Sequence, residues 1–197
     1  MLKRILLIVS VIAAGVAGWY TKRNLMEPAE LPYLKTLGGD FVLMSTLGKP
    51  AALSDFRGRV ILLNFGYMNC PDVCPTVLAR MRAVIDQLPD VDIDTQPIFI
   101  TLDPARDTTD RLRPYVRYFG DSFIGLSGTP EQIESVSKLF KVVATKESPT
   151  GEGDYGFIHS SHIYLLDTHG NVRMTFDQNI PLPVMVQTVY QLIAQLE

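Results

Sequence analysis

Cysteine and histidine are scarce in this sequence, which has two cysteines and three histidines among 197 residues. Two cysteines exclude a disulfide-rich scaffold and a zinc fold built on four cysteines. The sequence also lacks internal repeats and the low hydrophobicity of disordered chains, since 47% of its residues are hydrophobic and 20% are charged. These absences leave a globular protein with one domain of ordinary size plus an appendage.

Acidic residues are absent from the first 23 positions, which hold Lys3, Arg4, Lys22 and Arg23. With those four of the 18 basic side chains set aside, 14 basic and 21 acidic side chains remain, a net charge of −7. An acidic domain of this kind is a poor nucleic-acid binder. The charge distribution therefore excludes nucleic acid as a partner.

The apolar run Ile5–Tyr20 is 16 residues long and is interrupted only by Ser10. Its length lies between the core of a cleavable signal and a membrane-spanning helix, and Trp19 and Tyr20 suit a membrane interface. We predict an N-terminal membrane anchor helix over residues 1–23, with a cleaved signal as the alternative. Either segment would place the following domain outside the cytoplasm, facing the periplasm if the membrane is a bacterial inner membrane.

Residues 24–37 contain two prolines and no clear period, which predicts a linker before a domain over residues 38–197. Within the domain, strand and helix patterns alternate and end in a hairpin and a helix. This order predicts an α/β fold with a central mixed sheet flanked by helices, the order of a thioredoxin-like fold. The predicted strands are Val60–Gly66, Ile98–Leu102, Ile163–Leu166 and Val172–Phe176, and the predicted helices are Pro75–Leu88, Thr108–Phe119, Thr129–Phe140 and Pro183–Leu196.

The two cysteines, Cys70 and Cys74, lie between the buried strand Val60–Gly66 and the start of a helix. We expect Cys74 to be the N-cap and Pro75 the first helical residue, with Pro75 keeping Cys74 out of helical backbone angles. A helix N-terminus stabilises a thiolate, and the three-residue spacer lets both sulfurs converge on one point. The position therefore favours chemistry over packing.

Several roles are open to such a pair. A disulfide closing five residues would contribute only about 2 kcal/mol, so a purely structural bond is a weak explanation. A thiol–disulfide exchange centre is a second role, although the spacer is one residue longer than in C-x-x-C centres. A peroxidase lacks a clear activating cation beside Cys70. Two thiolates are too few for structural zinc but suit Cu(I), and an imidazole would make the site acceptable to Cu(II).

The third ligand would come from a histidine. His169 lies in the predicted turn Asp167–Gly170 and is read as a solvated turn residue. His159 and His162 precede a strand and follow Lys146–Gly156, a stretch rich in glycine and charge that we expect to be a mobile loop. The residues alone do not choose between His159 and His162.

Three ordered motifs resemble those of the Sco/SenC family of copper proteins. The segment GYMNCPDVCP, residues 66–75, resembles the family signature G-Y-x-x-C-P-D-x-C-P. Residues 102–108, LDPARDT, are similar to its D-P-x-R-D-T segment. A third motif, H-S-x-x-x-Y-L-x-D, is matched by His159, Ser160, Tyr164, Leu165 and Asp167.

The resemblance implies a thioredoxin-like domain that binds one copper through Cys70, Cys74 and His159. Family members supply copper to, or maintain the thiols of, the copper A site of cytochrome c oxidase subunit II. Another copper chaperone or a thiol reductase would then be a further partner. One departure is Ile158, where members usually have an aspartate that can orient the imidazole. That departure makes His162 an auxiliary or substitute ligand to consider.

The sequence therefore predicts a membrane-anchored copper metallochaperone that works by ligand exchange. The main alternative is an enzyme, a thiol–disulfide oxidoreductase that uses the same cysteines to reduce the oxidase copper site or another partner. A copper or redox sensor is a further alternative, because it would have the same sequence features.

Three charged residues and a methionine near the motifs have open roles. Asp103, Arg106 and Asp107 follow a strand, so they are expected at the sheet edge that carries the cysteines. They could form a docking surface or control a loop, or they could form a turn in which Asp107 or Thr108 caps the next helix. Met68 is expected to serve packing rather than to bind metal.

Overall fold

The computed structural model describes residues 30–89, 93–147 and 155–196. The predicted anchor over residues 1–23 and most of the expected mobile loop lie outside these ranges. Among the residues that the structure does describe, no helix is both long and apolar enough to cross a membrane. A compact unit begins at Leu31.

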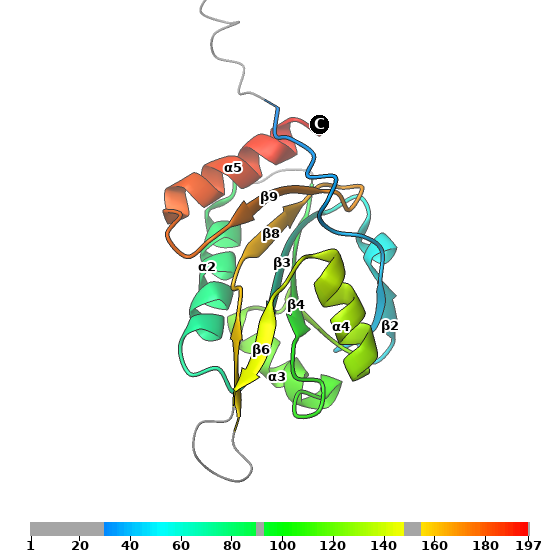
Figure 1. Ribbon diagram of the computed structural model, residues 1–197. Coiled ribbons are helices and arrows are strands. Elements are labelled where there is room, and N and C mark those ends of the chain that lie inside the picture. The colour runs from blue at the N-terminus through cyan, green and yellow to red at the C-terminus, as the bar shows by residue number, and fades with distance from the viewer. Residues whose placement is uncertain (1–29, 90–92, 148–154, 197) are drawn as a thin grey trace, which may run out of the picture. The chain divides into compact units, whose positions relative to one another are not determined.

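A seven-stranded mixed sheet forms the centre of this unit (Figure 1), which confirms the predicted architecture. Its order is β2-β1-β5-β4-β3-β8-β9, with β3, β4 and β5 parallel and the other pairs antiparallel. Two further strands, β6 and β7, pair separately. The strands are β1 (Val42–Ser45), β2 (Pro50–Ala52), β3 (Val60–Gly66), β4 (Thr95–Thr101), β5 (Ile124–Ser127), β6 (Ala144–Glu147), β7 (Gly156–His159), β8 (Ile163–Leu166) and β9 (Val172–Phe176).

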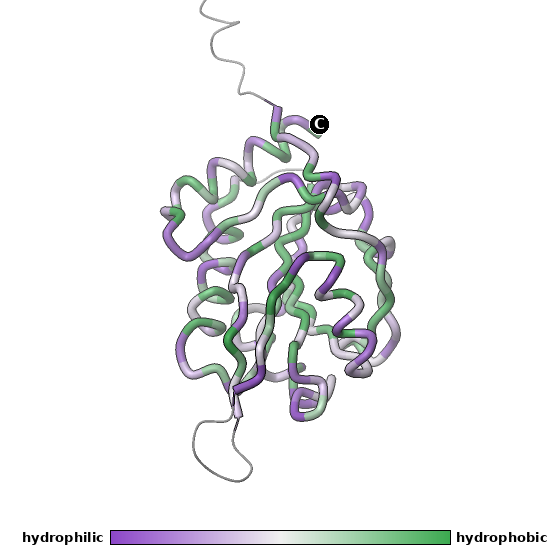
Figure 2. The backbone as a smooth tube through the Cα atoms, viewed as in Figure 1, coloured by the Kyte–Doolittle hydropathy of each residue, from purple (hydrophilic) through white to green (hydrophobic). Residues whose placement is uncertain are grey.

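Helices cover both faces of the sheet because its central strands are apolar on both sides. All seven residues of β3 are buried. One face packs against apolar side chains of α2, α3 and α5, and the other against α4 and the short helix η1. Figure 2 shows the hydrophobic colour running along these central strands. The helices are η1 (Leu53–Phe56), α2 (Val73–Gln87), α3 (Thr109–Phe119), α4 (Pro130–Leu139) and α5 (Leu182–Ala194).

Helix α2 begins earlier than the sequence predicts. Asp72 is its N-cap, so Cys74 is the second helical residue and Pro75 the third. The expectation that Pro75 keeps Cys74 out of the helix is therefore wrong. The first four N–H groups of a helix have no acceptor within it, so a proline in the first turn costs no hydrogen bond.

The segment predicted as a mobile loop is partly a hairpin. Lys146 and Glu147 belong to β6, and Gly156 begins β7, which ends at His159. All four residues of β6 are exposed, so the strand has no apolar pattern that the sequence could reveal. His159 is thus held by a strand pair, with Ala144 as its register partner.

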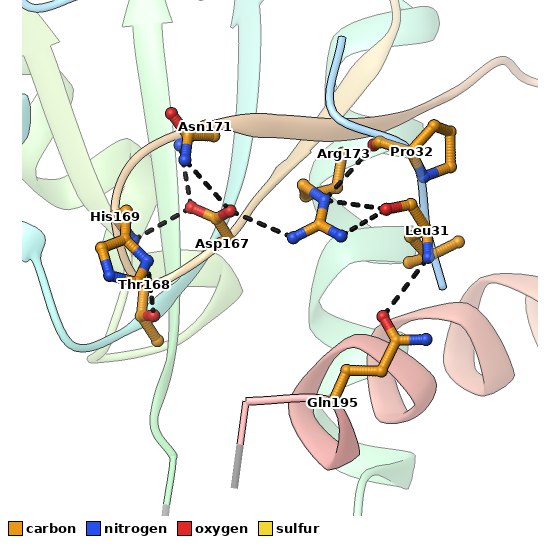
Figure 3. A network of polar contacts seen from close by, with 8 residues as sticks. All are labelled: Leu31, Pro32, Asp167, Thr168, His169, Asn171, Arg173 and Gln195. Carbon is orange, nitrogen blue, oxygen red and sulfur yellow. Dashed lines mark hydrogen bonds and ion pairs between the residues drawn. The ribbon is translucent and has the colours of Figure 1, made fainter. Parts of the chain in front are cut away.

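Residues 31–37, predicted as the second half of a linker, pack against the domain. Leu34 N–H donates to the Val172 carbonyl at 2.9 Å, and the Leu34 and Leu37 side chains contact the core. The buried Arg173 side chain pairs with Asp167 at 3.2 Å and donates to the Leu31 and Pro32 carbonyls (Figure 3). Burying a cation is costly unless it is paired, and these partners meet that requirement.

Phe140 is the centre of an aromatic group on the α4 face. It is fully buried, and its ring centroid lies 5.5 Å from Phe65, 5.2 Å from Tyr164 and 6.3 Å from Phe41. The Tyr164 hydroxyl donates to the Phe140 carbonyl at 2.9 Å. This group joins the end of α4 to the sheet.

We expect Phe140→Ala to lower the free energy of unfolding by about 3–5 kcal/mol, because it leaves a cavity among three aromatic rings. Chemical denaturation followed by circular dichroism measures the change. Tyr118→Ala removes an aromatic side chain that is 86% exposed and should cost less than about 0.5 kcal/mol. Equal losses in the two variants would contradict this account of the core.

Candidate metal centre

The cysteine loop begins where β3 ends, and the contact there is tight. A Cβ at Gly66 would lie 2.8 Å from Cys74 Sγ and 2.8 Å from the Phe99 ring, so only glycine fits. Leu102 N–H donates to the Gly66 carbonyl at 2.7 Å, which fixes this strand end to the neighbouring chain. Cys74 is therefore buried against the end of β3, while Cys70 is partly exposed.

His159 brings its imidazole to Cys74 from a distant part of the chain. Its Nε2 lies 3.6 Å from Cys74 Sγ, and its Nδ1 lies 3.0 Å from the Ser160 carbonyl. A carbonyl can only accept, so this bond assigns the proton to Nδ1 and leaves the Nε2 lone pair facing the sulfur. Burial lowers the pKa of His159, which favours this neutral imidazole.

Tyr67 forms the wall beside the imidazole. Its ring meets His159 edge-on at 5.9 Å and Phe157 at 5.3 Å between centroids. These ring contacts tie β7 to the cysteine loop. The sequence analysis gave Tyr67 no role, although its position three residues before Cys70 was a signal that it lies near the site.

Ile158 and His162 do not take part in this arrangement. Successive side chains of a strand point to opposite faces, so Ile158, which is 61% exposed, faces away from the imidazole of His159. The Ser160 carbonyl instead orients the imidazole, a backbone contact that no side-chain pattern signals. His162 packs its ring against Tyr164, so the contacts of the structure favour His159 over His162.

The segment after β4 supports the cysteine loop. The Asp107 carboxylate accepts from Met68 N–H at 2.9 Å and from the Thr101 hydroxyl at 2.7 Å. Burial raises the pKa of the Asp107 carboxyl, although both bonds favour its charged form. Thr108 is the N-cap of α3, one of the two residues expected there, although its side chain makes no capping hydrogen bond. Asp107 holds the backbone two residues before Cys70.

Asp103 and Arg106 hold the hairpin that carries His159. The Tyr155 hydroxyl donates to Asp103 at 2.8 Å, and Arg106 forms an ion pair with the same carboxylate. The Arg106 guanidinium also stacks over the Tyr155 ring at 3.6 Å and donates to the Tyr155 carbonyl at 2.9 Å. Of the roles that the sequence left open, these contacts support control of the loop.

Asn64 is a positioning residue that the sequence analysis did not single out. It is buried in the middle of β3, and its side-chain amide donates to the His162 carbonyl at 2.9 Å. The bond fixes the chain between His159 and β8. A single polar residue inside the run VILLNFG was the available signal, since a buried amide needs a partner.

The two thiols differ in acidity. Burial raises the pKa of Cys70, but the N–H groups of Cys74, Asp72 and Val73 outweigh it and lower that pKa below its usual value. The Cys74 N–H lies 3.5 Å from Cys70 Sγ. For Cys74, burial dominates and raises the pKa. The helix N-terminus thus stabilises the Cys70 thiolate, the more exposed of the two sulfurs.

The structure brings Cys74 and His159 together, and Cys70 lies two residues before Asp72, the N-cap of α2. Across the described ranges, no three side chains of His, Cys, Asp or Glu are already arranged as a metal site. The donors present are two sulfurs and one imidazole nitrogen. This set can bind a soft metal ion, or it can exchange thiols with a partner.

A mixed α/β domain with a cysteine pair at a strand-to-helix junction and an imidazole from a distant hairpin defines a thioredoxin-like metal or thiol protein. The family model described as SCO1/SenC matches residues 30–194. The chain therefore belongs to the SCO1/SenC family, as its motifs predict.

Relatives and solved structures agree with this assignment. The protein called Protein SCO2, mitochondrial, from Saccharomyces cerevisiae is 43% identical over 136 residues, which cover 68% of this chain and 45% of that protein. The structure of copper-bound ScoI from Arabidopsis thaliana is 33% identical, with a TM-score of 0.76 over 81% of this chain and 99% of that chain. BsSco, described as a cytochrome c oxidase assembly protein with a disulfide switch, is 25% identical, with a TM-score of 0.66 over 85% of this chain and 99% of that chain.

The difference in acidity predicts different reactivity. In the reduced full chain at pH 7, we expect iodoacetamide to modify Cys70 at least about tenfold faster than Cys74, because the thiolate is the nucleophile. Mass spectrometry of peptides from a time course measures both rates. In urea the two rates should converge, and equal rates in the folded chain would contradict the assigned acidities.

Proposed function

We propose that this protein is a copper-binding chaperone of cytochrome c oxidase assembly, with copper held by Cys70, Cys74 and His159. The observation that carries the proposal is the 3.6 Å separation between Cys74 Sγ and the lone pair of His159 Nε2. At a tetrahedral metal with metal–sulfur and metal–nitrogen distances near 2.3 and 2.0 Å, two such ligands stand about 3.5 Å apart. The two side chains are thus spaced as ligands of one ion.

The donor set favours copper over zinc. Structural zinc takes four protein ligands, and two thiolates with one imidazole leave that set incomplete. Soft thiolates select Cu(I), and the imidazole makes the set acceptable to Cu(II). The copper-bound structure of the Arabidopsis relative supports the same choice.

Copper is the cargo, and ligand exchange would load and release it. Cys70 is the partly exposed thiol with the lowered pKa, so it meets the incoming ion first. Cys74 and His159 complete the site from the buried side. Both thiols must be reduced for uptake, so a Cys70–Cys74 disulfide would be an off state.

The description of BsSco as an oxidase assembly protein supports the choice of recipient. We propose that the copper passes to subunit II of cytochrome c oxidase and that another copper chaperone or a thiol reductase prepares this protein. The anchor proposed for residues 1–23 would hold the domain at a membrane outside the cytoplasm, facing the periplasm in a bacterium, beside a membrane-bound recipient.

A thiol–disulfide oxidoreductase is the second candidate, and the unequal thiols favour it. The Cys70 thiolate would attack a partner disulfide, forming a mixed disulfide and releasing one partner thiolate. Cys74 would then attack Cys70, which leaves a Cys70–Cys74 disulfide and the second partner thiol. This sequence of steps moves two electrons to the partner and gives His159 no necessary role.

Copper titration of the reduced full chain in detergent tests the first proposal. We expect one tightly bound Cu(I) per chain, lost in Cys70→Ser and weakened at least about tenfold in His159→Ala, because each change removes a ligand. Competition with a Cu(I) chelator measures the affinity. His162→Ala is the matched control and should leave the affinity unchanged.

The same variants separate the two functions. Two results together would favour the oxidoreductase over the chaperone. The metal-free His159→Ala variant would reduce a model disulfide at the wild-type rate, and the copper affinity would be the same with and without His159. Copper binding that is weakened equally by His159→Ala and His162→Ala would contradict the assigned ligand.

A further inference from the structure

The hairpin of β6 and β7 depends on contacts outside itself. Its two strands pair with each other and, among the described strands, with no member of the seven-stranded sheet. A two-stranded hairpin alone is marginally stable in water. Because Ala144 of β6 is the register partner of His159, the imidazole lies wherever the hairpin lies. The contacts that fasten the hairpin to the rest of the domain therefore decide how firmly His159 is held.

Tyr155, the residue directly before β7, is a point where three segments meet. Its hydroxyl donates to the Asp103 carboxylate at 2.8 Å, and Arg106 forms an ion pair with the same carboxylate. The Arg106 guanidinium lies 3.6 Å from the centre of the Tyr155 ring, and the Lys146 ammonium, from β6, lies 3.5 Å from it. Cations are attracted to the face of an aromatic ring. Both arms of the hairpin are thus joined to the segment after β4 by one group of side chains, which we call the clasp: Asp103, Arg106, Lys146 and Tyr155.

The part of the clasp that follows β4 is fixed to the main sheet. Asp103 is 3% exposed, and its N–H donates at 2.9 Å to the hydroxyl of Thr101, the last residue of β4. The N–H groups of Arg106 and Asp107 donate to the Asp103 carbonyl at 3.2 and 2.9 Å, which closes a turn around it. The carboxylate that accepts from Tyr155 therefore keeps its place, and the hairpin is the part that can move.

A series of aromatic contacts connects the clasp to the imidazole. The Tyr155 ring lies 5.8 Å from Phe157, Phe157 lies 5.3 Å from Tyr67, and Tyr67 lies 5.9 Å from His159, all between ring centroids. Phe157 and His159 are two residues apart on β7, so they share one face of the strand. Packed side chains transmit a displacement to their neighbours. A change at Tyr155 therefore reaches His159 through the backbone of β7 and through these rings.

We propose that Tyr155 is a positioning residue of the candidate metal centre, and that the clasp controls how tightly copper is held. The clasp sets the fraction of molecules in which the His159 imidazole lies beside Cys74, and the affinity for an ion falls in proportion to that fraction. A loosened clasp would also let the imidazole leave a bound ion, which would speed release to a recipient. The inference rests on the proposed copper site, but the hold of the clasp on His159 is measurable without metal.

Competition with a Cu(I) chelator, in the reduced full chain in detergent, tests the effect on copper. We expect Tyr155→Ala to weaken the affinity at least about fivefold, but no more than His159→Ala does, because it acts only through that ligand. Tyr155→Phe keeps the ring and loses the bond to Asp103, so its affinity should lie between wild type and Tyr155→Ala. Tyr190→Ala, which removes a 41% exposed ring on α5, is the control and should change nothing.

A double-mutant cycle separates positioning from general weakening of the fold. In a His159→Ala background, Tyr155→Ala should leave the Cu(I) affinity unchanged within about twofold, because the imidazole through which it acts is gone. A purely structural effect would persist in that background. Equal fold losses in the two backgrounds would therefore overturn the proposal.

The lysine of the clasp gives a second variant that cannot leave a cavity. Lys146 is exposed, so Lys146→Met removes a cation from the Tyr155 ring and leaves the core intact. We expect it to weaken Cu(I) binding at least about twofold, because one of the two cation contacts is lost. Lys138→Met, on the exposed side of α4, is the matched control and should bind copper as wild type does. Equal affinities of the two lysine variants would count against the clasp.

Nuclear magnetic resonance of the metal-free chain, with carbon-13 in its histidines, measures the hold on His159 directly. At about pH 8.5 the imidazoles are neutral, so titration does not move their signals. The Tyr67 ring beside His159 should shift the His159 ring-proton signal away from its position in urea. Tyr155→Ala should move this signal back toward that position and leave the signal of His169, in an exposed turn, unchanged.

An unmoved His159 signal in Tyr155→Ala would overturn the proposal, whatever the copper titration gives. A signal that moves as expected in a chain that binds no copper would contradict the copper site and leave the role of Tyr155 in placing His159 supported.

Discussion

The contact between Gly66 and Cys74 is the constraint on which the rest of this site depends. Strand β3 is buried on both faces and bonded on both edges, so its end is a fixed point. With no side chain at Gly66, the Cys74 sulfur sits directly on that fixed point. In the proposed copper site, the position of the sulfur would decide where the imidazole must lie, because a metal ion accepts its ligands only within narrow distances. The core thus sets the geometry of a site that lies at its edge.

Two separate supports bring the imidazole to that sulfur. One comes from β3 and the other from the segment after β4. Asn64 of β3 holds the chain that follows His159, through the His162 carbonyl. Asp103 and Arg106 form an ion pair with each other, and each makes a hydrogen bond with Tyr155, the residue before β7. The histidine is therefore held on both sides along the chain, while β6, the strand that pairs with β7, is exposed to solvent. These supports place the imidazole beside Cys74 Sγ before any partner or ion is present.

The sequence was most informative where burial and motif coincide. The apolar run Val60–Gly66 and the cysteine motif predicted the central strand and the place of the thiols, because a strand buried on both faces has a continuous apolar pattern. The predicted start of α2 was wrong, because a proline only disfavours helical angles at the residue before it, and Pro75 in the first turn costs no helix hydrogen bond. The β6 strand was missed, because four exposed residues leave no pattern. The choice of His159 over His162 needed the family motif, and the Ser160 carbonyl that orients its imidazole is a backbone group that composition cannot reveal.

The sheet register also separates the chain entry from the candidate metal centre. Strand β8 is antiparallel to β3, and Ile61 pairs with Leu166, so Asp167 lies where β3 begins. Asp167 binds Arg173, which holds the Leu31 carbonyl at that same end. The cysteines follow the opposite end of β3. A chain entering at Leu31 is therefore fastened at one end of the sheet by buried charge, and the thiols and the hairpin that carries His159 lie together at the other end.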